Sequence, residues 1–128
     1  WPRPQNYRGP VLPEVSEALI AFNDEVAARF QNFEMRSDDE RKQLIEVLGV
    51  ERRVGDRFRT TFQTEEGQSV LRNIARDAGF FRALPITNGD FDPYELAADA
   101  GARMLYLRII RWIAIGHYRK EDEDAQVA

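Results

Sequence analysis

Few residues of this chain are of the types that carry out catalysis. His117 is the only histidine, it follows the expected last helix, and the sequence contains no cysteine. A lone histidine at a helix end interacts with the helix dipole more often than it acts as a base or a metal ligand. The sequence has no phosphate-binding loop, no nucleophilic serine turn and no zinc-helix motif. We therefore expect no catalytic site, no metal and no cofactor.

An acidic segment between two expected helices was tested as a calcium loop. The matching positions 1, 3, 5 and 12 of the calcium template are Asn88, Asp90, Asp92 and Asp99. Position 6 is then Pro93, where a calcium loop requires glycine for a sharp turn. A turn at Asn88-Gly89 followed by a helix cap at Asp92 explains these three residues without a metal.

An arginine cluster is the clearest candidate for binding chemistry. Phe58 and Phe62 lie among the arginines, and Glu51 and Asp56 lower the net charge of the cluster to +2. Interleaved basic and aromatic residues can bind a nucleic-acid backbone or an acidic protein partner. The alternative is that these arginines only form a solvated helix face. The cluster consists of Arg52, Arg53, Arg57 and Arg59.

The positions of these residues follow from helical periodicity. Val15, Leu19, Phe22, Val26 and Phe30 recur three or four residues apart, which predicts a helix from about residue 13 to 31. A similar stripe predicts a second helix from Ser37 to about Phe62, which Gly49 could interrupt. Another predicts a third helix from Thr64 to Gly79. The third stripe consists of Val70, Leu71, Ile74 and Ala78. A last helix is expected from Pro93 to Ile115.

These elements predict an all-α fold of four to five helices in a small bundle. Residues 1–12 contain three prolines with Trp1 and Tyr7, which predicts an extended N-terminal arm. Residues 13–116 would form a single helical domain. Residues 117–128 are expected to be a charged, disordered tail.

Composition excludes several classes of protein. The 128 residues are 43% hydrophobic and carry a net charge of −4, which disfavours a dedicated nucleic-acid binder. The longest apolar-rich stretch, from Met104 to Ile115, is interrupted by Arg108 and Arg111 and is too short to span a bilayer. We expect no signal peptide, and the absence of cysteine is consistent with synthesis in a reducing compartment.

The last helix carries more apolar residues than one buried face requires. We therefore expect part of it, Trp112 in particular, to face another subunit rather than the core of its own chain. The expected oligomer interface comprises Trp1, Tyr7, Leu105, Ile109, Trp112 and Ile113.

Residues 58–115 contain a capped helix that ends at a glycine followed by an aromatic residue, and then a second helix. The residues that define this structural motif are Thr64, Gly67, Gly79, Gly101 and Arg103, accompanied by Val70, Leu71, Phe80 and Leu105. Their order and spacing resemble a small helical domain family of tailed bacteriophages, typified by a protein encoded among the head and connector genes of a Bordetella podophage. At Gly67, glycine would let a neighbouring segment of backbone approach closely.

The resemblance implies a non-enzymatic virion or morphogenesis protein, made in the host bacterial cytoplasm. Its implied place is near the portal or among the internal proteins that are released with the DNA. Its partners would be copies of itself and other virion proteins. Two alternatives remain: a DNA-associated helical protein that uses the arginine cluster, and an adaptor that binds one partner protein through its last helix.

Overall fold

The computed structural model describes residues 12–79 and 93–127, and these residues contain five α-helices, one 3₁₀ turn and no strand. The all-α prediction is confirmed. The elements are α1 (Pro13–Arg29), η1 (Phe33–Met35), α2 (Asp38–Gln63), α3 (Glu65–Asp77), α4 (Pro93–His117) and α5 (Lys120–Val127). No helix in the described ranges is long and apolar enough to cross a membrane.

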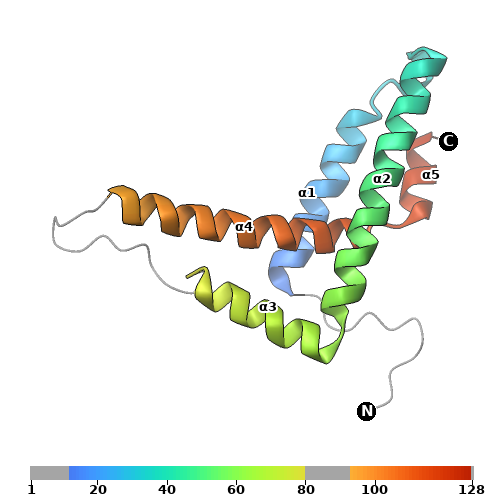
Figure 1. The fold of residues 1–128 in the computed structure, drawn as a ribbon. Helices are drawn as coiled ribbons and strands as arrows, with labels where there is room; N and C mark the ends of the chain where they lie inside the picture. Colours follow the sequence, from blue (N-terminus) through green and yellow to red (C-terminus); the bar gives the residue numbers. More distant parts are fainter. Residues whose placement is uncertain (1–11, 80–92, 128) are drawn as a thin grey trace.

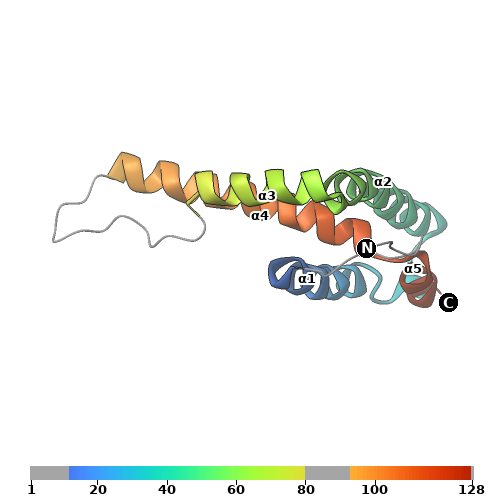
Figure 2. The same cartoon turned by 90° about the horizontal axis from the view of Figure 1, so that it is seen from below.

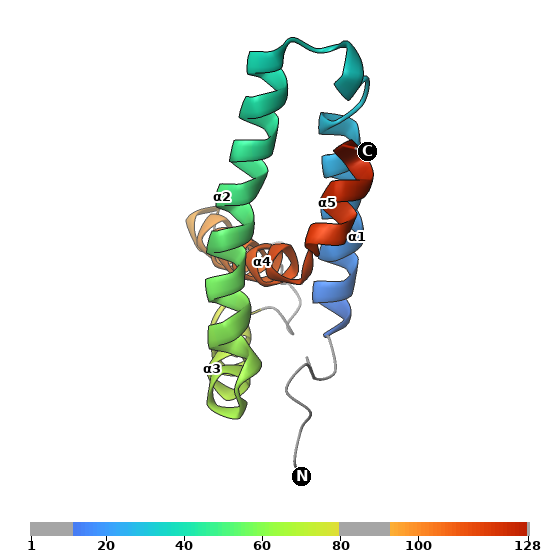
Figure 3. The ribbon, with the colours of Figure 1, turned by 90° about the vertical axis from the view of Figure 1, so that its right-hand side faces the viewer.

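The helices are arranged around the C-terminal half of α4. Helices α1 and α2 run in opposite directions, joined by η1, and α4 crosses between them (Figures 1 and 3). The N-terminal half of α4 extends beyond this pair, on the same side as α3 (Figures 1 and 2). Helix α5 turns back from the end of α4 toward η1 (Figure 3).

The predicted helix boundaries have clear physical causes. The Ser37 hydroxyl accepts a hydrogen bond from the Glu40 N–H at 3.2 Å, and the Thr64 hydroxyl accepts one from the Gly67 N–H at 2.9 Å. Gly79 follows α3 with a φ of 69°, a left-handed conformation that favours glycine. Helix α2 continues through Gly49 without a break.

Two clusters of buried side chains form the core, and α1 and α4 contribute to both. The first joins α1, α3 and α4 through Val15, Leu71, Ala75, Tyr106, Ile110, Ile113 and Ala114. The second joins α1, α2 and the end of α4 through Phe22, Val26, Phe30, Leu48, Ile115 and Tyr118. The predicted α3 stripe was partly wrong, because Val70 is half exposed whereas Ala75 is buried.

A pair of glycines allows α2 and α4 to cross closely. A methyl group on Gly55 would lie 2.6 Å from the backbone nitrogen of Gly116, and one on Gly116 would overlap the carbonyl oxygen of Gly55. Both contacts involve backbone atoms, which a rotamer change cannot relieve. The crossing therefore depends on the absence of a side chain at either position.

The prediction of a disordered tail was wrong for residues 120–127, which form α5. Glu123 is 7% exposed and forms an ion pair with Arg52 on α2. Val127 also packs against the second core cluster. A sequence rich in acids was expected to remain solvated, but one buried acid with a basic partner attaches the segment to the fold.

Candidate interaction surfaces

The N-terminal half of α4 presents apolar side chains to solvent. Tyr94 is 86% exposed, Met104 57% and Leu105 60%. Helices α1, α2 and α5 lie at the opposite end of α4 (Figure 1), where Ile110 and Ile115 are buried. The same helix is therefore a core element at one end and an uncovered apolar surface at the other.

The predicted interface residues on α4 are divided between its exposed part and its buried end. Leu105 is on the exposed half, and Ile109 is partly buried against the first core cluster. Trp112, which was expected to face another subunit, is partly buried and packs against the second core cluster. Its ring stacks on Phe58 with centroids 6.0 Å apart, and Ile113 is only 6% exposed. The excess of apolar residues identified the right helix, but Trp112 contacts α2, and Ile113 lies in the first core cluster with residues of α1 and α3.

The two aromatic residues of the N-terminal arm, Trp1 and Tyr7, lie outside the described residues. So do three members of the calcium pattern: Asn88, Asp90 and Asp92. Among the described residues, no three His, Cys, Asp or Glu side chains gather closely enough to hold a metal ion.

Among the described residues, two arginines of the cluster form ion pairs and two do not. Arg52 forms an ion pair with Glu123, and Arg59 pairs with Asp56 at 2.5 Å. The exposed Arg53 and Arg57 form no ion pair with any residue in the described ranges. Only half of the predicted cluster is thus available to a partner.

A broad groove brings these arginines together with the start of α5. Its volume is about 1360 Å³, and its apolar lining includes Ile45 and Val50 on α2. Six basic and four acidic side chains line it, which leaves a net positive charge: Glu46, Arg52, Arg53, Asp56, Arg57, Arg59, Arg119, Lys120, Glu121 and Glu123. Sequence reasoning missed Arg119 and Lys120 as neighbours of the cluster, because they were assigned to a disordered tail.

A second, smaller pocket of about 390 Å³ includes His117. It lies where α1 begins and α2 ends, and Val15, Leu71 and Ile113 supply apolar walls. The polar side chains in its described lining are those of Arg59, Gln63, Gln68, Arg72 and His117.

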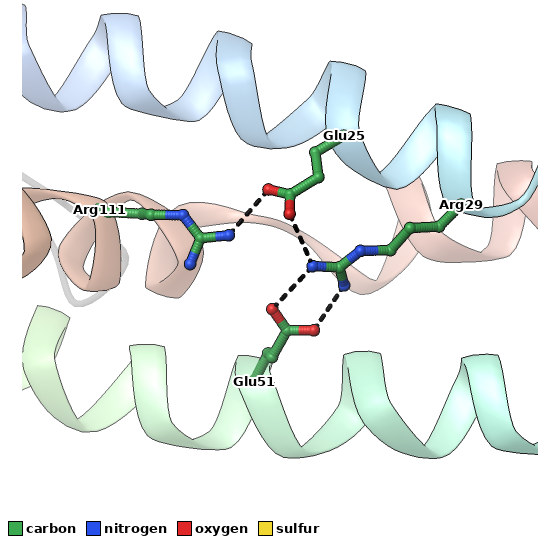
Figure 4. Close-up of polar contacts among 4 residues, drawn as sticks. All are labelled: Glu25, Arg29, Glu51 and Arg111. Atoms are coloured by element: carbon green, nitrogen blue, oxygen red, sulfur yellow. Dashed lines mark hydrogen bonds and ion pairs between the residues drawn. The ribbon is translucent and has the colours of Figure 1, made fainter.

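Four charged residues connect the three central helices (Figure 4). The Glu25 carboxylate on α1 accepts a hydrogen bond from Arg111 on α4 at 2.8 Å and one from Arg29 at 3.0 Å. Arg29 donates to Glu51 on α2 at 2.5 and 3.2 Å. Arg29 and Arg111 also lie over the Phe22 ring, 5.8 and 5.7 Å from its centroid. The two acids balance the two bases, and the network links α1, α2 and α4.

Acid stability should depend on this network. Burial alone would raise the pKa of Glu25, but hydrogen bonds from Arg111 and Arg29 and their positive charge outweigh it and lower the pKa below its ordinary value of 4.5. A carboxyl with a lowered pKa in the folded state stabilises the fold above its ordinary pKa and loses this contribution as pH falls through the lowered value.

We expect Glu25→Gln to cost about 1 kcal/mol or less at pH 7, because the carboxylate is 43% exposed. Its free energy of unfolding should fall less steeply than that of the wild type below about pH 4.5. Urea unfolding at pH 7 and at pH 3.5 measures both effects. Equal losses of stability on acidification in the two proteins would contradict the assigned role.

Tyr118 is buried with its hydroxyl unpaired among the described residues. Burial, with the negative charge of Asp122 and Glu123, raises its pKa to about 12. Its ring packs edge-on against Phe22 at 5.3 Å. A buried hydroxyl without a partner costs about 1 to 3 kcal/mol. Tyr118→Phe should therefore raise the free energy of unfolding by about 1 kcal/mol, and a loss of stability in denaturant titration would reveal a partner for the hydroxyl.

The motif residues of the sequence resemblance occupy α3, its two ends and α4. A methyl group on Gly67 would overlap the Thr61 carbonyl oxygen and lie 2.9 Å from the Phe62 Cα, which is the close approach of backbone expected at this position. Gly101 and Arg103 lie on the N-terminal half of α4, where Gly101 is exposed and Arg103 half-buried.

Comparison with known proteins identifies one family. A sequence model of the family described as Bbp19-like phage protein matches residues 58–128, just over half of the chain. The matched segment contains α3, α4, α5 and the end of α2. Neither a curated protein nor a solved structure gave a significant match.

Proposed function

Because the chain belongs to the Bbp19-like phage protein family, we propose that it is a structural component of the phage particle that acts in multiple copies, without catalysis. It would be made in the host bacterial cytoplasm and then incorporated into the virion. Its proposed place is beside the portal or among the internal proteins released with the DNA.

One observation carries this proposal: the N-terminal half of α4 exposes apolar side chains that the described elements leave uncovered. Met104, Leu105 and Leu107 are between 46% and 60% exposed on one short stretch of helix. Contiguous exposed apolar surface marks sites of protein–protein contact. A virion component needs such surfaces, because symmetric assemblies form by repeated use of the same contacts.

Peptide mass spectrometry of gradient-purified particles tests the proposal, with the infected-cell lysate as the reference. The chain should be retained in particles at a constant ratio to the major capsid protein through successive purification steps. A protein that is abundant in the lysate but lost from particles would not be a virion component.

The groove between α2 and α5 supports a second candidate function, contact with the phosphate backbone of packaged DNA. Arg53 and Arg57 lack acidic partners among the described residues, and Arg119 and Lys120 line the same groove. Binding that neutralises phosphates weakens steeply as salt rises, because counterions are released from the DNA.

Fluorescence anisotropy with a labelled DNA duplex at low and moderate salt tests this function. Arg57→Glu should reduce affinity about tenfold or more, whereas Arg76→Glu, an exposed arginine on α3, should change it little. No measurable affinity at low salt, or equal effects of the two substitutions, would exclude groove-mediated DNA binding.

A further inference from the structure

The exposed half of α4 has one continuous face at helical spacing. Its residues follow the i, i+3, i+4, i+7 pattern by which one helix packs against another. All seven members are exposed: Tyr94, Ala97, Ala98, Gly101, Met104, Leu105 and Arg108. We refer to these seven residues as the α4 face.

Glycine at position 101 has no explanation within the described fold. A methyl group there would have no atom within 4 Å, whereas at Gly55, Gly67 and Gly116 it would collide with backbone. Glycine inside a helix costs about 1 kcal/mol relative to alanine. Close approach of a second helix is the circumstance in which this glycine becomes useful.

We propose that the α4 face binds the α4 face of a second copy of this chain, antiparallel, with the two-fold axis at Gly101. The proposal rests on the proposed multi-copy function and specifies its contact. In this register Gly101 faces Gly101, Ala98 faces Met104, and Ala97 faces Leu105. Around the axis, the bulky Met104 and Leu105 each meet an alanine, as efficient packing requires.

Charge and shape favour the antiparallel direction. At the ends of the pair, the Arg108 guanidinium meets the Tyr94 ring, a favourable cation–π arrangement. A parallel pair would instead place Arg108 beside Arg108 and Leu105 beside Leu105. Figure 1 shows α1, α2 and α5 at one end of α4. In an antiparallel pair, these three helices of one copy and those of the other copy therefore lie at opposite ends of the paired α4 helices.

Cysteine cross-linking tests the register, since the natural chain contains no cysteine. Gly101→Cys should yield a disulfide-linked dimer on mild oxidation. Leu105→Cys alone should not, because its partner position is 97, but a mixture of Leu105→Cys with Ala97→Cys should yield the mixed dimer. Ile20→Cys on α1, 63% exposed, measures random collision. Preferential cross-linking of Leu105→Cys to itself would overturn the antiparallel register.

Sedimentation equilibrium up to concentrations on the order of 100 µM tests the association itself, because a single helix pair is at the small end of stable interfaces. Gly101→Leu should weaken the dimer about tenfold or more by overpacking the crossing. Gly101→Ala should weaken dimerisation while raising the thermal stability of the dilute monomer, two opposite effects that a purely internal role would not produce.

Two outcomes would refute the pairing and identify another occupant. A wild-type chain that stays monomeric, with no cross-link above the Ile20→Cys level, would refute the pairing, and a cross-link from the α4 face to residues 80–92 of the same chain would then identify that segment as the occupant. A one-to-one complex with a different virion protein would assign the face to that protein. In either case, retention of the chain in purified particles would leave the proposed virion function standing, so the two failures are distinguishable.

Discussion

Gly116→Ala and Gly55→Ala are each expected to destabilise the protein by about 3 kcal/mol or more, because each added methyl group meets backbone atoms of the facing helix. Helices α2 and α4 would have to separate at their crossing, and both core clusters depend on the position of α4. For a domain with a total stability of about 5 to 15 kcal/mol, such a loss is severe.

Differential scanning calorimetry measures this effect as a fall in Tm of roughly 10 °C or more. Gly101→Ala is the matched control, because its methyl group enters open space and improves helix propensity. At protein concentrations low enough to keep the chain monomeric, the control should raise Tm slightly. Similar changes at all three positions would contradict the assigned crossing of α2 and α4.

Glu123→Ala should lower the free energy of unfolding by about 2 kcal/mol and release α5 from α2. The Glu123 side chain is 9% exposed, and its partner Arg52 is 27% exposed on α2. Removal of one member of a buried pair leaves the other without compensation for its lost hydration. Chemical denaturation measures the loss, and amide exchange in residues 120–127 should accelerate in the variant.

A double-mutant cycle with Arg52→Ala separates the pair from other effects of either residue. In the Arg52→Ala variant, Glu123→Ala should lower the free energy of unfolding much less than it does in the wild type. Glu121→Ala, an exposed acid on the same helix, should change stability by less than about 0.5 kcal/mol. If Glu121→Ala and Glu123→Ala behave alike, α5 is not held by this ion pair.

Local signals in the sequence predicted the helices well, because caps and periodic stripes act within a few residues. The Ser37 and Thr64 caps, the stop at Gly79 and the start of α4 at Pro93 required no knowledge of tertiary structure. Continuity through Gly49 was left open, since one glycine weakens a helix without ending it.

Contacts between distant segments could not be predicted in this way. Nothing in the acidic run around Glu123 indicates that Arg52, far away in sequence, would pair with it. The same limit explains Trp112, whose burial depends on Phe58 from α2. Glu25 and Arg29 lie four residues apart on α1, but only the crossing of the three helices brings Glu51 and Arg111 to them, so the sequence did not predict the network.

The apolar excess of α4 was recognised from sequence, but the structure assigns it to the other end of the helix. Ile110, Ile113 and Ile115 fill the core, and the exposed surface consists of the residues around Gly101 and Leu105. This region lies within the segment that matches the phage family. The part of α4 that the fold leaves uncovered is thus the part that we assign to assembly.

Quantitative mass spectrometry of purified particles, with isotope-labelled peptides of this chain and of the major capsid protein, tests whether the protein is a structural part of the virion. We expect a fixed copy number per particle that is greater than one. If the α4 faces pair throughout, this copy number should be an even number. A content below one copy per particle, or one that varies between preparations, would contradict a structural role in the virion.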